Sequence, residues 1–239
     1  MKVLVTGGAS GLGGAITRTL AEGGASVTFT FNRSAQAAAD LERDLGVTGM
    51  QCDYSREQDV QALIDRLPAL DLDVLVHNAI ADGVKAAHFH SLDAGALERG
   101  LLTNVMPVVR VTQAAIGLFR AKRSGRIITV LTSYLIGKPP TGLSAYVATK
   151  AYLHSLSKSW AVENARFGIT SNCVSPSMMP TRLTEDADPR VQEALVSQHP
   201  LKRLLTPREA AEAVAFLAGP ASAHVNGINL VLNAATEIV

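Results

Sequence analysis

Short runs of β-branched and aliphatic residues alternate with longer segments of helical periodicity along the whole chain. Runs typical of buried strands occupy positions 3–6, 27–31, 48–52, 74–76, 126–131, 169–174 and 228–232. Patterns typical of helices begin near Leu12, just after Phe31, and near Arg56, Asp93, Ser144 and Thr206. Because hairpin signals are missing, this alternation predicts an α/β fold with one doubly wound, mostly parallel sheet that helices cover on both faces.

No change of composition divides the chain, so residues 1–239 are expected to form a single domain. The least regular stretch runs over 177–203 and contains the acidic turn "TEDADP". In a doubly wound sheet, irregular loops near the carboxyl ends of the strands border the ligand site. We therefore expect 177–203 to form a lid over the substrate.

Composition and charge exclude several classes of partner. Hydrophobic residues make up 47% of the chain, and 22 basic against 21 acidic residues give a net charge of +1. Neither nucleic acid nor an anionic membrane is therefore expected as a partner. Cys52 and Cys173 lie in separate apolar runs without metal spacing, and His88 and His90 lack a third ligand. This spacing predicts no metal site. With no apolar span of 18 residues, we expect a cytoplasmic protein.

A glycine-rich segment, "VLVTGGASGLGGAI", lies between the first predicted strand and the first predicted helix. Gly7 permits a tight turn there, and Gly11 and Gly13 let the backbone approach a pyrophosphate at the helix amino terminus. The alternative is a glycine-rich turn that only joins the two elements. The position directly after the first strand favours dinucleotide binding.

Tyr146 and Lys150 lie four residues apart in the helix that begins at Ser144, so both side chains share one face. A free phenol has a pKa of about 10, and a nearby ammonium group stabilises the phenolate. Ser133 precedes Tyr146 by thirteen residues and ends a predicted strand, where a hydroxyl can hydrogen-bond a reacting carbonyl oxygen. Simple helix packing is the alternative, but the coincidence of Ser133 with the glycine loop favours catalysis.

Further motifs follow in a fixed order along the chain. "DYS" comes after the third predicted strand, Asn78-Ala79 after the fourth, and the Ser–Tyr-xxx-Lys set later. Together with the glycine loop, they resemble the short-chain dehydrogenase/reductase family over essentially the whole chain. The segments "NRSAQAA", "GRIITV" and "TPREAAEAVAFLAGP" look most similar to its 3-oxoacyl-acyl-carrier-protein reductases. The resemblance implies a Rossmann-type fold and an NAD(P)H-dependent oxidoreductase.

The resemblance also implies a role for each matching residue. Ser133 polarises the substrate, Tyr146 exchanges the proton, Lys150 tunes Tyr146 and holds the nicotinamide ribose, and Asn104 supports a proton-relay water. Asp53 matches an aspartate that contacts adenine, and Thr181 matches a residue that contacts the nicotinamide carboxamide. The full set expected to bind the cofactor is Thr6, Gly7, Ser10, Gly11, Leu12, Gly13, Asn32, Arg33, Ser34, Asp53, Tyr54, Asn78, Ala79, Tyr146, Lys150, Pro176, Met179 and Thr181.

The segment after the second predicted strand bears on the choice of dinucleotide. Enzymes that use NAD usually place a carboxylate there, whereas this chain has Asn32-Arg33-Ser34. The planar guanidinium of Arg33 suits a 2′-phosphate, so NADPH is the expected cofactor. The alternative for Arg33 is a solvated arginine at a helix start. Ser10 argues against NADPH, because many relatives that prefer NADPH carry a basic residue at that position.

Several positions depart from the family pattern. Its Asn-Asn-Ala-Gly segment is His77-Asn78-Ala79-Ile80 here, and its late Asn-Gly-Gly segment is Asn233-Ala234-Ala235. We expect a structural role for His77 and a bulkier cleft wall at Ile80.

Three functions are compatible with these observations. The first is NADPH-dependent reduction of a 3-oxoacyl thioester or related ketone, with Lys122, Arg123 and Arg166 offering cations to an acidic acyl carrier protein. The second is oxidation of a small sugar, polyol or cyclic alcohol, and the third is a non-catalytic dinucleotide-binding subunit. The resemblance also implies a homotetramer or homodimer formed through the helices that carry Asn104 and Tyr146.

Overall fold

The computed structural model describes residues 1–81, 83, 86–180, 193, 196–197 and 199–238. Seven strands form one sheet in the order β3-β2-β1-β4-β5-β6-β7, and every neighbouring pair is parallel. The strands are β1 Lys2–Val5, β2 Ser26–Phe31, β3 Thr48–Gln51, β4 Val74–His77, β5 Gly125–Val130, β6 Ile169–Pro176 and β7 Asn229–Leu232. The predicted fold is confirmed, and the strand ends differ from the predicted ends by at most two residues.

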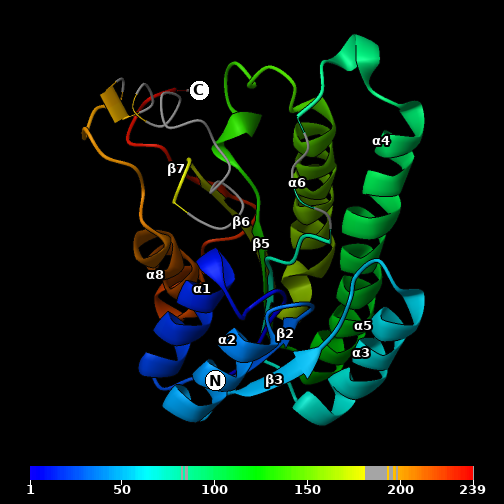
Figure 1. The fold of residues 1–239 in the computed structure, drawn as a ribbon. Coiled ribbons are helices and arrows are strands. Elements are labelled where there is room, and N and C mark those ends of the chain that lie inside the picture. The colour runs from blue at the N-terminus through cyan, green and yellow to red at the C-terminus, as the bar shows by residue number, and fades with distance from the viewer. Residues whose placement is uncertain (82, 84–85, 181–192, 194–195, 198, 239) are drawn as a thin grey trace.

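Helices cover both faces of this sheet (Figure 1). They are α1 Gly11–Glu22, α2 Ala35–Leu45, α3 Glu57–Leu70, α4 Ala94–Gly100, α5 Met106–Lys122, α6 Ser144–Asn164 and α8 Pro207–Ala218. One buried cluster joins α1, α2 and α8 to the sheet, and a second joins α3, α5 and α6 to its other face. The chain order reverses between β1 and β4, and ligands bind at such a switch point, beyond the carboxyl ends of the strands.

Local capping chemistry marks the starts of α4 and α8 and the end of α2. Asp93 accepts a hydrogen bond from Gly95 N at the start of α4. Thr206 and Glu209 form a reciprocal capping box at the start of α8, where proline occupies the first turn. Gly46 ends α2 with φ of 65°, a left-handed conformation that glycine adopts without strain. At α4 and α8, these polar residues explain why the helix start could be predicted from the sequence.

The helix predicted to begin at Asp93 is not a regular α-helix throughout. A π-helical turn, Leu101–Val105, separates α4 from α5. Together they span Ala94–Lys122, which is long and apolar enough to cross a membrane by length and composition. A single such helix is weak support for a membrane span, since core helices of soluble proteins pass the same test. Here α5 packs against α3 and β5.

The family's late glycines are replaced by residues that keep the glycine conformation. Ala234 and Ala235 have φ of 49° and 61°. The Asn233 side chain holds this turn by accepting a hydrogen bond from Ala235 N and donating one to Glu237 O. A left-handed conformation costs an L-residue roughly 1–2 kcal/mol, so this turn is strained.

We therefore expect the double variant Ala234→Gly/Ala235→Gly to be more stable than the parent. Relief of strain outweighs the greater flexibility of glycine in the unfolded chain, and the net gain in unfolding free energy should be about 1 kcal/mol. Urea denaturation measures this change. The control is Ala39→Gly, in the interior of α2, which should lose about 1 kcal/mol. Destabilisation of both variants to the same degree would contradict the strain argument.

Candidate active site

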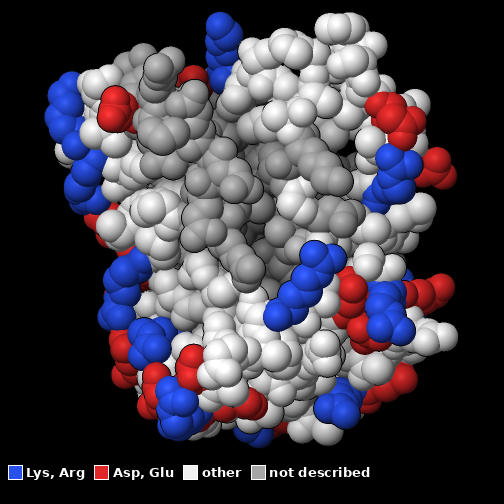
Figure 2. Space-filling model, in the orientation of Figure 1, with Lys and Arg blue, Asp and Glu red and all other residues white. Residues whose placement is uncertain are grey.

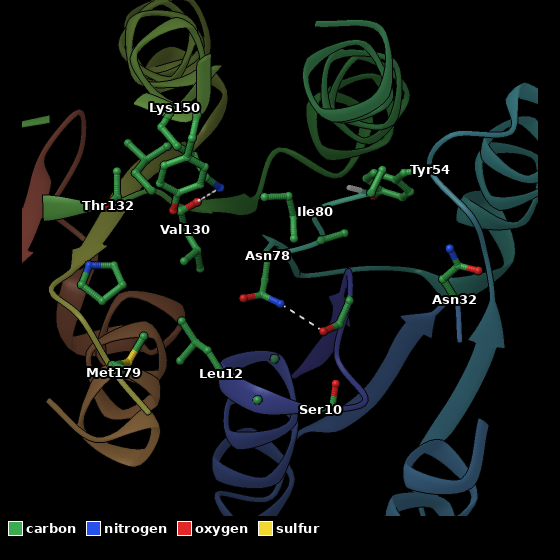
Figure 3. A pocket seen from close by; sticks show the side chains of 18 of the residues that line it. Ser10, Leu12, Asn32, Tyr54, Asn78, Ile80, Val130, Thr132, Lys150 and Met179 are labelled. Carbon is green, nitrogen blue, oxygen red and sulfur yellow. Dashed lines mark hydrogen bonds between the residues drawn. The ribbon is translucent and has the colours of Figure 1, made fainter. Parts of the chain in front are cut away.

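A cavity of about 680 Å³ opens at the carboxyl ends of the strands, across the switch point. Figure 3 shows it running from Asn32 and Tyr54 at one end, past Asn78 and Ile80, to Lys150 and Thr132 at the other. On the face in Figure 2, basic and acidic side chains are interspersed over the described surface. Fifteen of the predicted site residues line this cavity: Gly7, Ser10, Gly11, Leu12, Gly13, Asn32, Arg33, Ser34, Tyr54, Asn78, Ala79, Tyr146, Lys150, Pro176 and Met179.

The glycine loop has the close backbone contacts that its sequence predicts. Gly7 has φ of 66°, and a β-carbon there would meet Ala79 Cα at 2.8 Å. A β-carbon on Gly13 would overlap the carbonyl oxygen of Gly7. The Asn78 side chain holds this loop by donating to Gly7 O at 3.0 Å (Figure 3). The backbone at the amino terminus of α1 is thus open to a phosphate, and the loop fits the pyrophosphate of a dinucleotide.

Thr6 supports the loop from behind and does not line the cavity. Its hydroxyl is fully buried, donates to Val76 O, and accepts hydrogen bonds from Asn78 N and Ala79 N. The expected direct contact between Thr6 and the cofactor is therefore replaced by a supporting role, because every hydrogen-bonding position of this hydroxyl is used by the protein.

Two serine hydroxyls and an arginine gather at one end of the cavity. Ser10 and Ser34 are the N-cap residues of α1 and α2, yet neither side chain caps its helix. Their hydroxyl oxygens lie 3.4 Å apart, and Arg33 lines the same part of the cavity. Two helix amino termini, two hydroxyls and a guanidinium provide donors suited to an anion.

Asp53 is hydrogen-bonded within its own turn. Its carboxylate accepts hydrogen bonds from the amide and hydroxyl of Ser55, and the hydroxyl bond is the main cause of its lowered pKa. The neighbours Cys52 and Tyr54 line the cavity, whereas Asp53 does not. Asp53 thus has the local hydrogen bonds of a turn residue, and its expected contact with adenine stays a prediction.

Tyr146 and Lys150 lie together at the opposite end of the cavity. Burial raises the pKa of Tyr146 to about 12, so the phenol keeps its proton at neutral pH. The Lys150 ammonium lies 5.9 Å from the centre of the Tyr146 ring and donates to Val130 O at 2.9 Å (Figure 3). Burial lowers the pKa of Lys150 to about 8. The hydrogen bond to Val130 O fixes the ammonium beside the phenol, and the expected stabilisation of the phenolate by Lys150 stays a prediction.

Asn104 lies in the π-helical turn and outside the cavity wall. Its Oδ1 accepts a hydrogen bond from Ala81 N at 2.8 Å, and its Nδ2 donates to Thr103 Oγ1. The side chain is therefore used to fix the loop that follows β4. A role for Asn104 in proton relay would have to use its backbone, since a π-helical turn leaves backbone groups outside the regular hydrogen-bond pattern.

Of the adjacent residues Thr132 and Ser133, the cavity is lined by Thr132 and not by the predicted Ser133. Ser133 starts the 3-10 turn Ser133–Leu135 and is not among the residues that line the cavity. Thr132 lines the cavity and is buried. The sequence analysis missed Thr132, although the adjacent pair of hydroxyl residues at the strand end was a signal that either could face the site.

His77 has the structural role that was expected. It is 2% exposed, its Nε2 shares a hydrogen bond of 2.8 Å with Thr112 Oγ1, and burial lowers its pKa to about 3. A ring that stays neutral at this depth is no general base near neutral pH. Within the described part of the chain, no three His, Cys, Asp or Glu side chains gather as a metal site requires.

The far end of the cavity has an apolar wall. Ile80 lines it, as expected from its size, and Tyr134, Leu143, Met178 and Met179 face the same space. Ala87 N, after β4, donates to Gly142 O, before α6, at 3.0 Å, so two loops distant in sequence form one wall. Thr181 and most of the predicted lid at 177–203 lie outside the described residues.

Comparisons with known proteins agree with this geometry. A family model described as enoyl-(acyl carrier protein) reductase matches residues 7–234. Similar proteins include cis-4-hydroxycyclohexanecarboxylate dehydrogenase from Sinomonas cyclohexanicum, 36% identical over 96% of this chain and 94% of that protein. A 3-oxoacyl-acyl-carrier-protein reductase from Vibrio cholerae is 34% identical over the same shares. A solved short chain dehydrogenase/reductase family protein covers 96% of this chain and 94% of its own, with 33% identity and a TM-score of 0.85.

The fold and the site define an oxidoreductase that binds a nicotinamide dinucleotide. The chain belongs to the short-chain dehydrogenase/reductase family, as its motifs predicted. Its relatives are dehydrogenases and reductases, which argues against a non-catalytic subunit.

Proposed function

We propose that the protein is an NADPH-dependent ketoreductase that reduces a 3-oxoacyl thioester, or a related biosynthetic ketone, to a secondary alcohol. The observation that supports this most directly is that one cavity joins the glycine loop to a protonated, partly buried Tyr146. When bound, the reduced nicotinamide supplies a hydride. Tyr146 supplies the proton to the carbonyl oxygen, and Lys150 orients the cofactor and stabilises negative charge at the phenol.

NADPH is supported by the donors at one end of the cavity. Arg33, Ser10 and Ser34 face a position where an anion would be surrounded by hydroxyl, guanidinium and helix amino termini. Ser10, which in sequence argued against NADPH, contributes a hydroxyl that its helix does not use. The neighbouring carboxylate of Asp53 is engaged by Ser55 and does not line this cavity.

Arg33→Asp should therefore reverse the preference between the two cofactors. Loss of a charge-assisted hydrogen bond, and repulsion by the new carboxylate, should weaken NADPH binding by about 10- to 100-fold, while NADH binding improves. Fluorescence titration with each cofactor measures the change. Arg66→Asp, on the exposed side of α3, makes the same charge change away from the cavity and should alter neither affinity. Equal affinity of the parent for both cofactors would contradict the assignment.

The substrate class is inferred from the wall of the cavity. Ile80, Leu143 and two methionines offer apolar contacts, which suit an acyl chain or a ring. The second candidate is a dehydrogenase of cyclic alcohols, which the bulk of Ile80 and the similarity to the cyclohexanecarboxylate enzyme favour. Initial rates with NADPH on a panel of 3-oxoacyl thioesters and cyclic ketones decide between them. Higher kcat/KM for thioesters supports the first, and preference for free rings supports the second.

The carrier protein remains a possible partner, but its expected docking site is changed. Lys122 Nζ forms ion pairs with Asp73 at 2.6 Å and Asp71 at 3.1 Å, so it is already neutralised. Arg123 and Arg166 instead gather with Arg120 around the Phe167 ring, 4.8–5.9 Å from its centre. This cluster lies at the amino ends of β5 and β6, roughly 20 Å from the cavity.

An assembly of several subunits is supported by exposed apolar side chains in the π-helical turn, at the start of α5 and on α6. Leu101, Leu102, Met106 and Tyr152 are 40–58% exposed. Tyr152 belongs to this surface although it lies on a helix that packs against the sheet. We infer a homotetramer formed through α5 and α6, which light scattering of the purified protein tests. Both cysteines are free and buried, consistent with the predicted cytoplasmic location.

A further inference from the structure

The 3-10 turn after β5, Ser133–Leu135, places its side chains in different surroundings. Leu135 packs against the buried cluster that joins α3, α5 and α6 to the sheet. Tyr134 lines the cavity, whereas Ser133 does not. The turn itself packs against α6, whose first turns carry Tyr146. Two phenols therefore line the same cavity from two elements that are in contact.

Hydrogen bonds fix the backbone on both sides of Tyr134. Its N–H donates to Thr132 Oγ1 at 3.3 Å, and Leu135 N donates to Thr132 O at 3.2 Å. Ile136 N donates to Ser133 O at 2.9 Å and closes the turn. A binding group that the fold already holds in place loses little conformational entropy when a ligand arrives. Tyr134 is thus suited to recognise a bound molecule.

The hydroxyl of Tyr134 is available for such a contact. Within the described part of the chain it has no hydrogen-bond partner, and it is not sealed inside the protein, unlike the unpartnered hydroxyl of Tyr54. Burial of the ring raises the pKa of Tyr134, so the phenol keeps its proton at neutral pH. It can therefore donate a hydrogen bond to an acceptor atom in the cavity.

The wall that Tyr134 shares is otherwise apolar and uncharged. Among the described residues that line the cavity, the charged side chains are Arg33, at the opposite end, and Lys150, which is expected to serve the cofactor. A carboxylate against this wall would have no countercharge, and its burial would be costly. An uncharged carbonyl oxygen would lose less on leaving water and would gain a hydrogen bond from Tyr134. The apolar members of the wall are Ile80, Ala86, Leu143, Met178 and Met179.

We propose that Tyr134 determines substrate specificity by donating a hydrogen bond to a second, uncharged carbonyl oxygen of the substrate. This inference rests on the proposed function, in which Tyr146 protonates the oxygen of the reacting ketone. In a 3-oxoacyl thioester one methylene separates the ketone from the thioester carbonyl, so binding one near Tyr146 keeps the other in the same part of the cavity. The thioester carbonyl is not reduced, and its hydrogen bond with Tyr134 orients the ketone for reaction.

The test uses two ketones that differ at a single position. One is the 3-oxobutanoyl thioester of N-acetylcysteamine, and the other is the matching 3-oxobutyl thioether, in which a methylene replaces the thioester carbonyl. Tyr134→Phe removes the hydroxyl and keeps the ring. Its kcat/KM with NADPH should fall by about 3- to 10-fold for the thioester, the loss expected for one neutral hydrogen bond. For the thioether it should stay within about twofold of the parent, since no such bond is lost.

A second measurement needs no turnover and separates this proposal from the proposed function. Calorimetric titration of each compound into the protein saturated with oxidised NADP gives its Kd without hydride transfer. Tyr134→Phe should weaken binding of the thioester by the same factor and leave binding of the thioether unchanged. Equal effects on both compounds, no effect on either, or a parent that does not bind the thioester would overturn the role of Tyr134. A parent that binds the thioester but reduces neither compound would instead count against the proposed function, and the titration would still decide the role of Tyr134.

Discussion

Replacing Tyr146 with phenylalanine should lower turnover by at least about a hundredfold, the usual contribution of a positioned proton donor. The substitution removes one hydroxyl and keeps the ring, so the packing at the start of α6 should persist. NADPH should still bind, because its phosphates are expected to rest on the Gly7–Gly13 loop at the other side of the cavity. Steady-state kinetics and cofactor titration of the same preparation measure both quantities.

Tyr152→Phe is the matched control for this experiment. It makes the same chemical change one and a half turns further along α6, where the side chain is 51% exposed. Its turnover should equal that of the parent. A folded Tyr146→Phe protein that binds NADPH and reduces ketones at nearly the parental rate would refute the assignment of Tyr146 as the proton donor.

Replacing Lys150 with methionine should change activity and stability in opposite directions. The ammonium is 7% exposed, and burial lowers its pKa to about 8 from the ordinary value of 10.5. The unfolded chain therefore binds this proton more tightly than the folded protein does. At every pH at which Lys150 is charged in the unfolded chain, this difference lowers the free energy of unfolding. At pH 7 the variant should be more stable by about 2 kcal/mol, after allowing for the lost hydrogen bond to Val130. Turnover and NADPH affinity should both fall, because the ammonium serves the ribose and the phenol.

The stability difference between Lys150→Met and the parent should depend on pH, because the pKa of Lys150 is lowered in the folded protein. The penalty in the parent is complete below about pH 8 and disappears as the pH rises to about 10.5, where the unfolded lysine also loses its proton. The stability difference between variant and parent should shrink over that window, as urea denaturation at pH 7 and pH 10 would show. Lys158→Met, on the exposed side of α6, should show no such difference. A Lys150→Met protein that is less stable than the parent at pH 7 would contradict this account.

The fold could be predicted from local patterns because each element has its own signal. Buried parallel strands are continuous apolar runs, and helices such as α4 and α8 begin at polar residues that bind the first free amides. The π-helical turn at Leu101–Val105 had no such signal, since its sequence is as apolar and helix-forming as its flanks. Within it, Asn104 accepts a hydrogen bond from Ala81 N, a tertiary contact that local sequence does not announce.

The site was predicted less completely, because a motif gives residue types but not directions. Thr132 and Ser133 carry the same group one residue apart, and only the turn after β5 decides which one enters the cavity. Asp53 and Lys122 have the right charge for the expected contacts. Their nearest partners, Ser55 and the two aspartates at the end of α3 and before β4, are visible only when the chain is folded.

The hydrogen bond between Ala87 N and Gly142 O has a consequence for how substrate range can change in this protein. It joins the loop after β4 to the loop before α6, so a shift of one backbone pulls on the other. The two segments are more than fifty positions apart in sequence, yet this bond couples their backbones. Replacing only one of the two loops with that of a relative would therefore disturb the geometry of this hydrogen bond. Exchanging both loops together would keep the two partners of this bond matched.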